Sequence, residues 1–249
     1  MLMEQHVQVP TIEDLKAVGL HPKDLLVYAA LKKYENSETH SCYPSLTTIS
    51  SQVGSSISAV RRSISLLEKA GLLTQEFRQG ESTIYHFSPY KKFEVFSKEF
   101  IESDFLSAME KAYLISIQSK LFKKPETHTG VTSFTNIELS QSLNMGTKLI
   151  SEADKQLQSK GILQIVKTAA KDSMTGLVKP EKVFDFDKFA NAVVFEFNNV
   201  YSTIDKTAQH MQNQIDDQQK EIEELKLALK LNGIDPTKVK EQIKNAITL

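Results

Sequence analysis

Hydrophobic residues recur every three or four positions through the stretch SLTTISSQVGSSISAVRRSISLLEKAG, from Ser45 to Gly71. This spacing predicts two amphipathic helices. Gly54 is expected to end the first helix, because glycine readily takes a left-handed backbone, and Ser56 is expected to cap the second. Two short helices joined by a tight turn form a helix-turn-helix, whose second helix can enter the major groove of DNA.

The predicted second helix has an apolar face and a polar face. Its expected core residues are Ile57, Val60, Ile64 and Leu67. The residues expected to face outward are Ser58, Arg61, Arg62, Ser65 and Lys69. Arginine can form a bidentate pair with guanine, and serine can bond a base edge or a phosphate. Because no acidic residue precedes Glu68 on this helix, we expect the outward face to bind DNA. The alternative is a helix used for protein contacts.

Two short β-strands are predicted after this helix, over Leu72–Phe77 and Thr83–Phe87. The residues between them, RQGES, are typical of a polar turn. A helix-turn-helix followed by such a hairpin is a winged helix, and we expect Arg78 to anchor this wing to DNA. Ser56 can also offer its hydroxyl or amide to a phosphate from the helix start.

Residues 25–87 resemble the winged-helix family of phage and plasmid replication-initiation proteins and related bacterial regulators. The matching segments are LLVYAALKKY, YPSLTTIS and the pattern G-x-S-x-x-x-V-x-R-x-I-x-x-L-x-x-x-G-L-L over Gly54–Leu73. Ser50 and Ser55 depart from the family, which usually has an alanine and a small apolar residue there. The resemblance covers about a quarter of the chain. It implies a DNA-binding fold and leaves the biological role open.

Segments on either side complete the first domain, which we place at residues 1–90. A helix is predicted over Pro22–Tyr34, a short strand over His6–Val9 and a short helix over Thr11–Val18. Residues 91–103 form a connector. Its aromatic residues indicate that it packs, partly as helix, against one of the domains.

The next part of the chain, residues 104–187, repeats the first. Apolar or glycine positions match at a constant offset of 90, which predicts a duplicated winged helix. The matched residues are Ile49, Val53, Val60, Leu67, Gly71, Leu72 and Leu73 with Leu139, Leu143, Ile150, Leu157, Gly161, Ile162 and Leu163.

The second copy is expected to contain three helices and a hairpin. The predicted helices are Phe105–Phe122, Thr135–Leu143 and Thr147–Lys160, and the predicted strands are Ile162–Thr168 and Val183–Phe186. Between the strands lies a long wing, Ala169–Lys182, whose lysines suit a loop that reaches a phosphate backbone.

The third helix of this copy has a mixed outward face. Lys148, Ser151 and Lys155 are candidate DNA contacts, and Lys171 is a candidate from the wing. Glu152 and Asp154 flank that face and would repel phosphates. Two readings therefore remain open for this copy: a second DNA-binding unit, or a domain for dimer or partner contacts.

A long helix is predicted over residues 188–231, with a heptad seam. The a positions are Ala208, Ile215, Ile222 and Leu229, and the d positions are Ile204, Met211, Gln218 and Leu225. Isoleucine at a with leucine at d favours a parallel two-stranded coiled coil, so we expect a homodimer through residues 200–231. The alternative is a helix folded back on its own domains. Residues 232–249 are expected to form a short final helix, Thr237–Ile247.

Composition narrows the possible functions. The formal net charge is −1 at pH 7, so a DNA-binding surface must be a local basic patch. The single cysteine excludes an intrachain disulfide, and no apolar run is long enough to span a membrane, which favours a cytoplasmic, nucleoid-associated protein of a bacterial cell. No phosphate-binding glycine loop, zinc-ligand set or catalytic triad is recognisable. We therefore expect neither catalysis nor a cofactor.

The fold class expected from these patterns is mostly α with small β-hairpins: tandem winged helix-turn-helix domains followed by a coiled-coil helix. The expected function is sequence-preferring binding of double-stranded DNA. Three uses are compatible with it: a replication initiator that binds a phage or plasmid origin, a transcriptional regulator that binds an operator, or an assembly factor that binds protein. The first two would place the protein in contact with the replication or transcription machinery.

Overall fold

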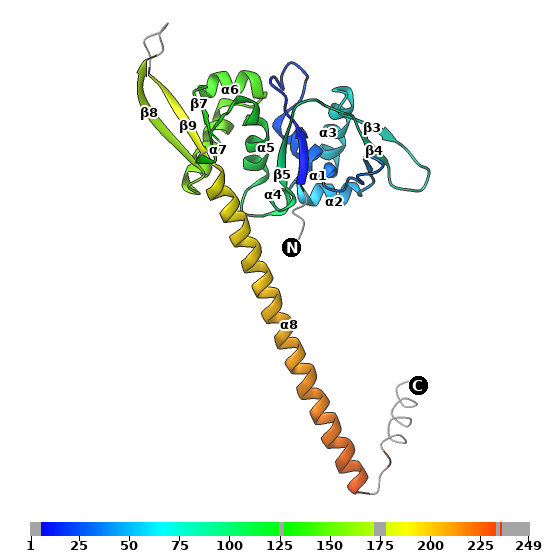
Figure 1. Cartoon of the computed structure of the whole chain (residues 1–249). Helices are drawn as coiled ribbons and strands as arrows, with labels where there is room; N and C mark the ends of the chain where they lie inside the picture. Colours follow the sequence, from blue (N-terminus) through cyan, green and yellow to red (C-terminus); the bar gives the residue numbers. More distant parts are fainter. Residues whose placement is uncertain (1–5, 125–126, 172–177, 233–234, 236–249) are drawn as a thin grey trace. The chain divides into compact units, whose positions relative to one another are not determined.

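The computed structural model describes residues 6–124, 127–171, 178–232 and 235, with side chains except at 167–179 and 189–208. The chain divides into two compact units, Met1–Phe197 and Asn198–Leu249 (Figure 1). The first unit contains two groups of helices and strands. We call residues 22–87 the first three-helix group and residues 108–185 the second.

The first three-helix group contains the predicted helix-turn-helix. Its helices are α1 (Pro22–Lys32), α2 (Leu46–Gln52) and α3 (Ile57–Lys69). Serine side chains cap α2 and α3: Ser45 Oγ accepts from the Thr48 amide at 3.0 Å, and Ser56 Oγ accepts from the Ala59 amide at 3.3 Å. Gly54 has a φ of +56°, the left-handed conformation predicted for the turn.

A three-stranded antiparallel sheet covers the first group, in the order β2-β4-β3. Its strands are β2 (Ser41–Cys42), β3 (Leu73–Glu76) and β4 (Ile84–Phe87). The β3–β4 hairpin is the predicted wing, with Leu73 opposite Phe87. Both residues are buried, because this face of the hairpin packs on the helices.

The segment before α1 differs in part from its prediction. β1 (His6–Pro10) confirms the expected strand and pairs antiparallel with β5 (Phe93–Ser97). The helix predicted over Thr11–Val18 is wrong, because that segment consists of turns. The amide of Leu15 donates to the carbonyl of Ser142 at 2.8 Å, so a contact with the second group takes the place of a helical bond.

The predicted connector packs as expected. After β5 it forms the short helix α4 (Lys98–Glu102), in which Phe100 and Ile101 are buried. Residues 93–102 therefore pair and pack rather than form a free linker.

The second three-helix group repeats the element order of the first. Its helices are α5 (Ala108–Ile117), α6 (Asn136–Leu143) and α7 (Thr147–Ser159), and α6 and α7 begin 90 residues after α2 and α3. α5 is shorter than the predicted helix, because a 3-10 turn (η1, Gln118–Lys120) and strand β6 (Phe122–Lys124) follow it.

Four antiparallel strands cover the second group, in the order β6-β7-β9-β8. They include β7 (Thr129–Thr132), β8 (Leu163–Lys171) and β9 (Val178–Asp185). Much of the segment predicted as a long wing loop is therefore strand, and only residues 172–177 of it lie outside the described part.

The two three-helix groups share one hydrophobic core. α1 packs against α5 (Figure 1), and buried residues of both groups form one continuous cluster. Tyr28 meets Phe87 edge to face at 5.3 Å in the first group, and Tyr113 meets Phe184 in the same way at 6.4 Å in the second. Both three-helix groups therefore belong to one compact unit.

A single helix, α8 (Phe186–Leu231), follows β9. On its second half, the seam residues Met211, Ile215, Gln218, Ile222 and Leu225 are exposed within the single chain, and Leu229 is half-buried. The short helix predicted over Thr237–Ile247 lies outside the described residues. Among the helices of the described chain, none is long and apolar enough to cross a bilayer.

Candidate nucleic-acid interface

α3 is held from behind by its apolar face and by one polar contact. Val60, Ile64 and Leu67 are buried, as predicted. Ser63 is also buried, and its hydroxyl donates to Asp24 on α1 at 2.5 Å. The helix is therefore fixed on α1, and its other side is left to solvent.

Ile57 corrects the sequence prediction, because 38% of its surface is exposed rather than buried in the core. It is the first residue of α3. N-terminal residues of a recognition helix meet base edges, and an apolar side chain there can contact a thymine methyl group. Its position in the first turn of the predicted helix could have indicated this role from the sequence.

The five outward residues predicted on α3, Ser58, Arg61, Arg62, Ser65 and Lys69, are all exposed. Within the described residues, the side chains of Arg61 and Arg62 form neither an ion pair nor a hydrogen bond. Both guanidinium groups can therefore meet a base or a phosphate without first breaking a contact. Ser56, which caps α3, is exposed at the same end of the helix.

The charge of Arg61 acts on the base of the wing. Burial raises the pKa of Tyr85 on β4, and the nearby Arg61 charge partly offsets this rise. The hairpin itself also carries the exposed carboxylates Glu76 and Glu81, which pair with His86 and Arg78.

Arg78 is placed on the wing, as predicted, but its guanidinium is used within the turn. It donates to the Ser82 carbonyl from Nη2 at 2.9 Å and from Nε at 3.2 Å, and its Nη1 lies 2.5 Å from Glu81. A contact between Arg78 and a phosphate would have to replace these bonds. The residue beside it, Phe77, is 78% exposed and was not singled out from the sequence.

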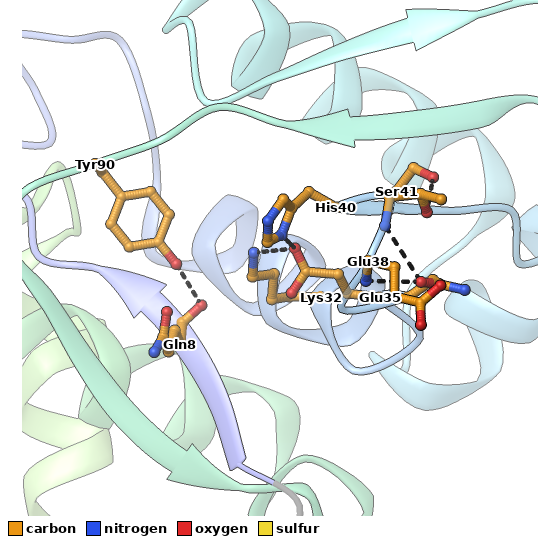
Figure 2. Close-up of polar contacts among 9 residues, drawn as sticks. Gln8, Lys32, Glu35, Glu38, His40, Ser41 and Tyr90 are labelled. Atoms are coloured by element: carbon orange, nitrogen blue, oxygen red, sulfur yellow. Dashed lines mark hydrogen bonds and ion pairs between the residues drawn. The ribbon is translucent and has the colours of Figure 1, made fainter.

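Polar contacts connect α1, the loop that follows it and the strands of the first group (Figure 2). Lys32 Nζ lies 2.5 Å from Glu35, and His40 Nδ1 lies 3.4 Å from the same carboxylate. Tyr90 donates to the Gln8 carbonyl at 2.8 Å, which ties the chain after β4 to β1. These contacts hold the scaffold that carries the helix-turn-helix.

The candidate residues of the second group are spread over α7 and β8. Lys148 and Lys155 are exposed, and Ser151 is half-buried. Lys171 ends β8, and its side chain is outside the described part. Ser151 and Lys155 line a pocket of about 340 Å³ between α7 and the β8–β9 hairpin, whose other lining residues are Phe134, Thr135, Asn136, Asp154, Gln158, Ile165, Pro180 and Lys182.

Asp154 and Lys182 correct the prediction for this face. Both are buried, and Lys182 Nζ lies 2.7 Å from Asp154 Oδ2. Asp154 also accepts from the Tyr113 hydroxyl at 3.0 Å. Burial lowers the pKa of Lys182, and the bond to Asp154 partly offsets this. Asp154 therefore does not repel DNA from the outward face, and Lys182 is not a wing lysine.

Glu152 is the acidic residue that remains exposed on α7. It lies between Ser151 and the buried Ala153, so it borders the face with Lys148 and Lys155. The second group thus presents weaker positive charge than α3.

Comparison with protein families finds a match at the first three-helix group. Residues 18–73 match the family described as a helix-turn-helix domain, and this range covers α1, α2 and α3. No curated protein matches the chain. The first three-helix group therefore contains a helix-turn-helix domain, a fold whose usual ligand is DNA.

Proposed function

We propose that the protein binds double-stranded DNA with sequence preference, with α3 in the major groove and the β3–β4 wing beside it. The observation that supports this most concerns Arg61 and Arg62 on the second helix of a helix-turn-helix domain. Both are exposed, and neither has an ion-pair partner among the residues that the structure describes. Ser58 and Ser65 add hydroxyls on the same face, and Ser56 adds the capped helix start. Binding, rather than catalysis, is the activity that these groups can perform.

The second three-helix group is proposed to be a second winged helix. The constant offset of α6 and α7, and the matching Tyr–Phe edge contacts in the two cores, support a duplication. Lys148 and Lys155 would supply weaker phosphate contacts from α7. A role in docking a partner protein is the competing possibility for this group.

We further propose a parallel homodimer through residues 200–231. Met211, Ile215, Ile222 and Leu225 follow a heptad seam and are 45–58% exposed in the single chain. A second copy of the same helix would bury them, since isoleucine at a and leucine at d suit two parallel strands. A dimer presents two reading helices, so the expected target is an inverted or direct repeat.

For the biological role we propose an origin-binding replication initiator of a phage or plasmid, in contact with the replication machinery. The resemblance of residues 25–87 to that family favours it. A transcriptional regulator has the same interface, and the location of the target separates the two roles. Repeated sites beside a replication origin favour the initiator, and a single operator within a promoter favours the regulator.

Selection of bound fragments from random duplex DNA tests the proposal. The expected result is a motif present twice at a fixed spacing. A parallel titration of mixed-sequence duplex at low and moderate salt is expected to show binding that weakens as salt rises. An absence of enriched motifs, together with no binding at either salt, would contradict DNA binding and favour an assembly factor.

A further inference from the structure

The wing of the first group carries an aromatic ring next to its polar turn. Phe77 directly follows β3, and 78% of its surface is exposed. A single exposed apolar residue is common on protein surfaces and carries no meaning by itself. The position of Phe77 in the hairpin is what suggests a function for its ring.

Residues on one face of the β3–β4 hairpin pack toward α3. Leu73 and Tyr85 on this face are buried, and Gln75 Nε2 donates to Glu68 on α3 at 2.7 Å. Side chains alternate along a strand, and continuing the alternation of β3 by one residue puts Phe77, two residues after Gln75, on the same face. The ring of Phe77 is therefore on the α3 side of the wing, one residue beyond the end of β3.

The turn that follows Phe77 is closed by its own bonds. Arg78 donates to the Ser82 carbonyl and pairs with Glu81, and Gly80 takes a φ of +75°. The loop between β3 and β4 projects away from the helices (Figure 1). The cation of this turn is thus engaged in shaping it. Among the exposed side chains in and beside the turn, Phe77 is the apolar one.

We propose that Phe77 is a DNA-contacting residue, which inserts its ring into the minor groove next to the site read by α3 and opens one base step. Apolar side chains that enter the minor groove unstack a step and bend the duplex. Pyrimidine–purine steps are the easiest to open, so Phe77 would add specificity for such a step at a fixed distance from the α3 contacts. This inference rests on the proposed function, because it requires α3 to bind duplex DNA.

The test compares the full-length protein with Phe77→Ala and Phe77→Leu on a duplex chosen by the selection above. Phe122→Ala is the matched control, because Phe122 is 71% exposed on β6, away from the wing. Dissociation constants are measured at several salt concentrations. Bending is followed by energy transfer between dyes at the two duplex ends, and unstacking by 2-aminopurine placed at each step beside the α3 site.

We expect Phe77→Ala to bind roughly 5- to 100-fold more weakly, the range typical of losing one aromatic contact with a base. The slope of log K against log salt should not change, because no charge is removed. Bending and 2-aminopurine fluorescence should fall with Phe77→Ala and be partly kept by Phe77→Leu. Phe122→Ala should match the parent protein.

Three results would overturn the inference, and each leads to a different conclusion. Parent-like affinity and bending in Phe77→Ala would reject the wedge and leave the proposed function intact. The same DNA result with loss of a protein partner on Phe77→Ala would assign the ring to protein docking. Failure of the parent protein to bind any duplex would reject the proposed function, and the wedge with it.

Discussion

The side-chain amide of Asn144 donates a hydrogen bond of 2.9 Å to the backbone carbonyl of Leu20. Asn144 lies in the turn between α6 and α7, and Leu20 lies just before α1. The turn of the first group has a reciprocal position: a Cβ added at Gly54 would lie 3.7 Å from the Cβ of Ala108, the first residue of α5. The turn between α6 and α7 therefore contacts the segment before α1, and the turn between α2 and α3 lies beside the start of α5.

Asn144 has a φ of +52°, so its substitutions separate the hydrogen bond from the backbone conformation. Asn144→Gly keeps the left-handed conformation and loses the bond to Leu20, which should cost about 1 kcal/mol of unfolding free energy. Asn144→Ala should cost about 1–2 kcal/mol more, because alanine disfavours that conformation. Urea unfolding measures both values, and equal stability of the two variants would show that the backbone conformation is not important.

The buried pair Asp154 and Lys182 should be sensitive to the loss of one partner. Lys182→Met leaves a buried carboxylate without its cation and should lower the unfolding free energy by about 3–5 kcal/mol. Replacing Asp154, Lys182 and Tyr113 together by Leu, Met and Phe should recover most of that loss.

Lys155→Met is the control for the buried pair, because Lys155 is exposed and should change stability by less than about 0.5 kcal/mol. A Lys182→Met variant as stable as this control would contradict the buried ion pair.

Cys42 predicts an alkaline loss of stability. Burial raises the pKa of its thiol to about 12, whereas an unfolded chain has a thiol pKa of about 8.5. The folded state therefore holds this proton more tightly, so stability from this group is complete below about pH 8.5 and falls as the pH rises toward 12.

Cys42→Ala should flatten this pH dependence of the unfolding free energy between pH 8 and 10. Because Cys42 is the single cysteine, its reaction with a thiol reagent at pH 8 should be slow in the native protein and fast in urea. Equal rates in both states would place the thiol at the surface.

The proposed dimer can be tested on α8. Ile222→Asp places a charge in the heptad seam and should convert the dimer to a monomer, measured by sedimentation equilibrium. Lys220→Asp, on the opposite side of the heptad, should remain dimeric. Truncation before Ser202 should leave the first unit folded and monomeric, and a dimeric truncated chain would contradict the assignment.

Local patterns predicted the helix-turn-helix well, because its caps and apolar spacing depend on neighbouring residues. Ser56 and Gly54 took the predicted roles, and the constant offset located α6 and α7 within a residue. The segment Thr11–Val18 was mispredicted because its backbone bonds to Ser142, far along the chain. No local pattern contains that contact.

The burial of the polar residues in the second group was harder to predict. Their charge suggested an exposed loop, and the prediction did not consider which face of a strand each residue would occupy. Lys182 lies two residues before the buried Phe184 on β9, so alternation placed it on the core face. That signal was present in the sequence once β9 was extended to its full length. The exposure of Phe77 could not be predicted without knowing where the contact between β3 and α3 ends.

Titration of the selected duplex with the Arg61→Ala/Arg62→Ala variant at several salt concentrations tests the central claim most directly. Lys23→Ala, which removes an exposed charge from α1, is the control. We predict that the double variant folds normally and loses roughly 1–3 kcal/mol of specific binding free energy for each lost base contact, while Lys23→Ala binds like the parent protein. A double variant that binds the selected duplex as tightly as the parent would contradict the assignment of α3 as the DNA-reading helix.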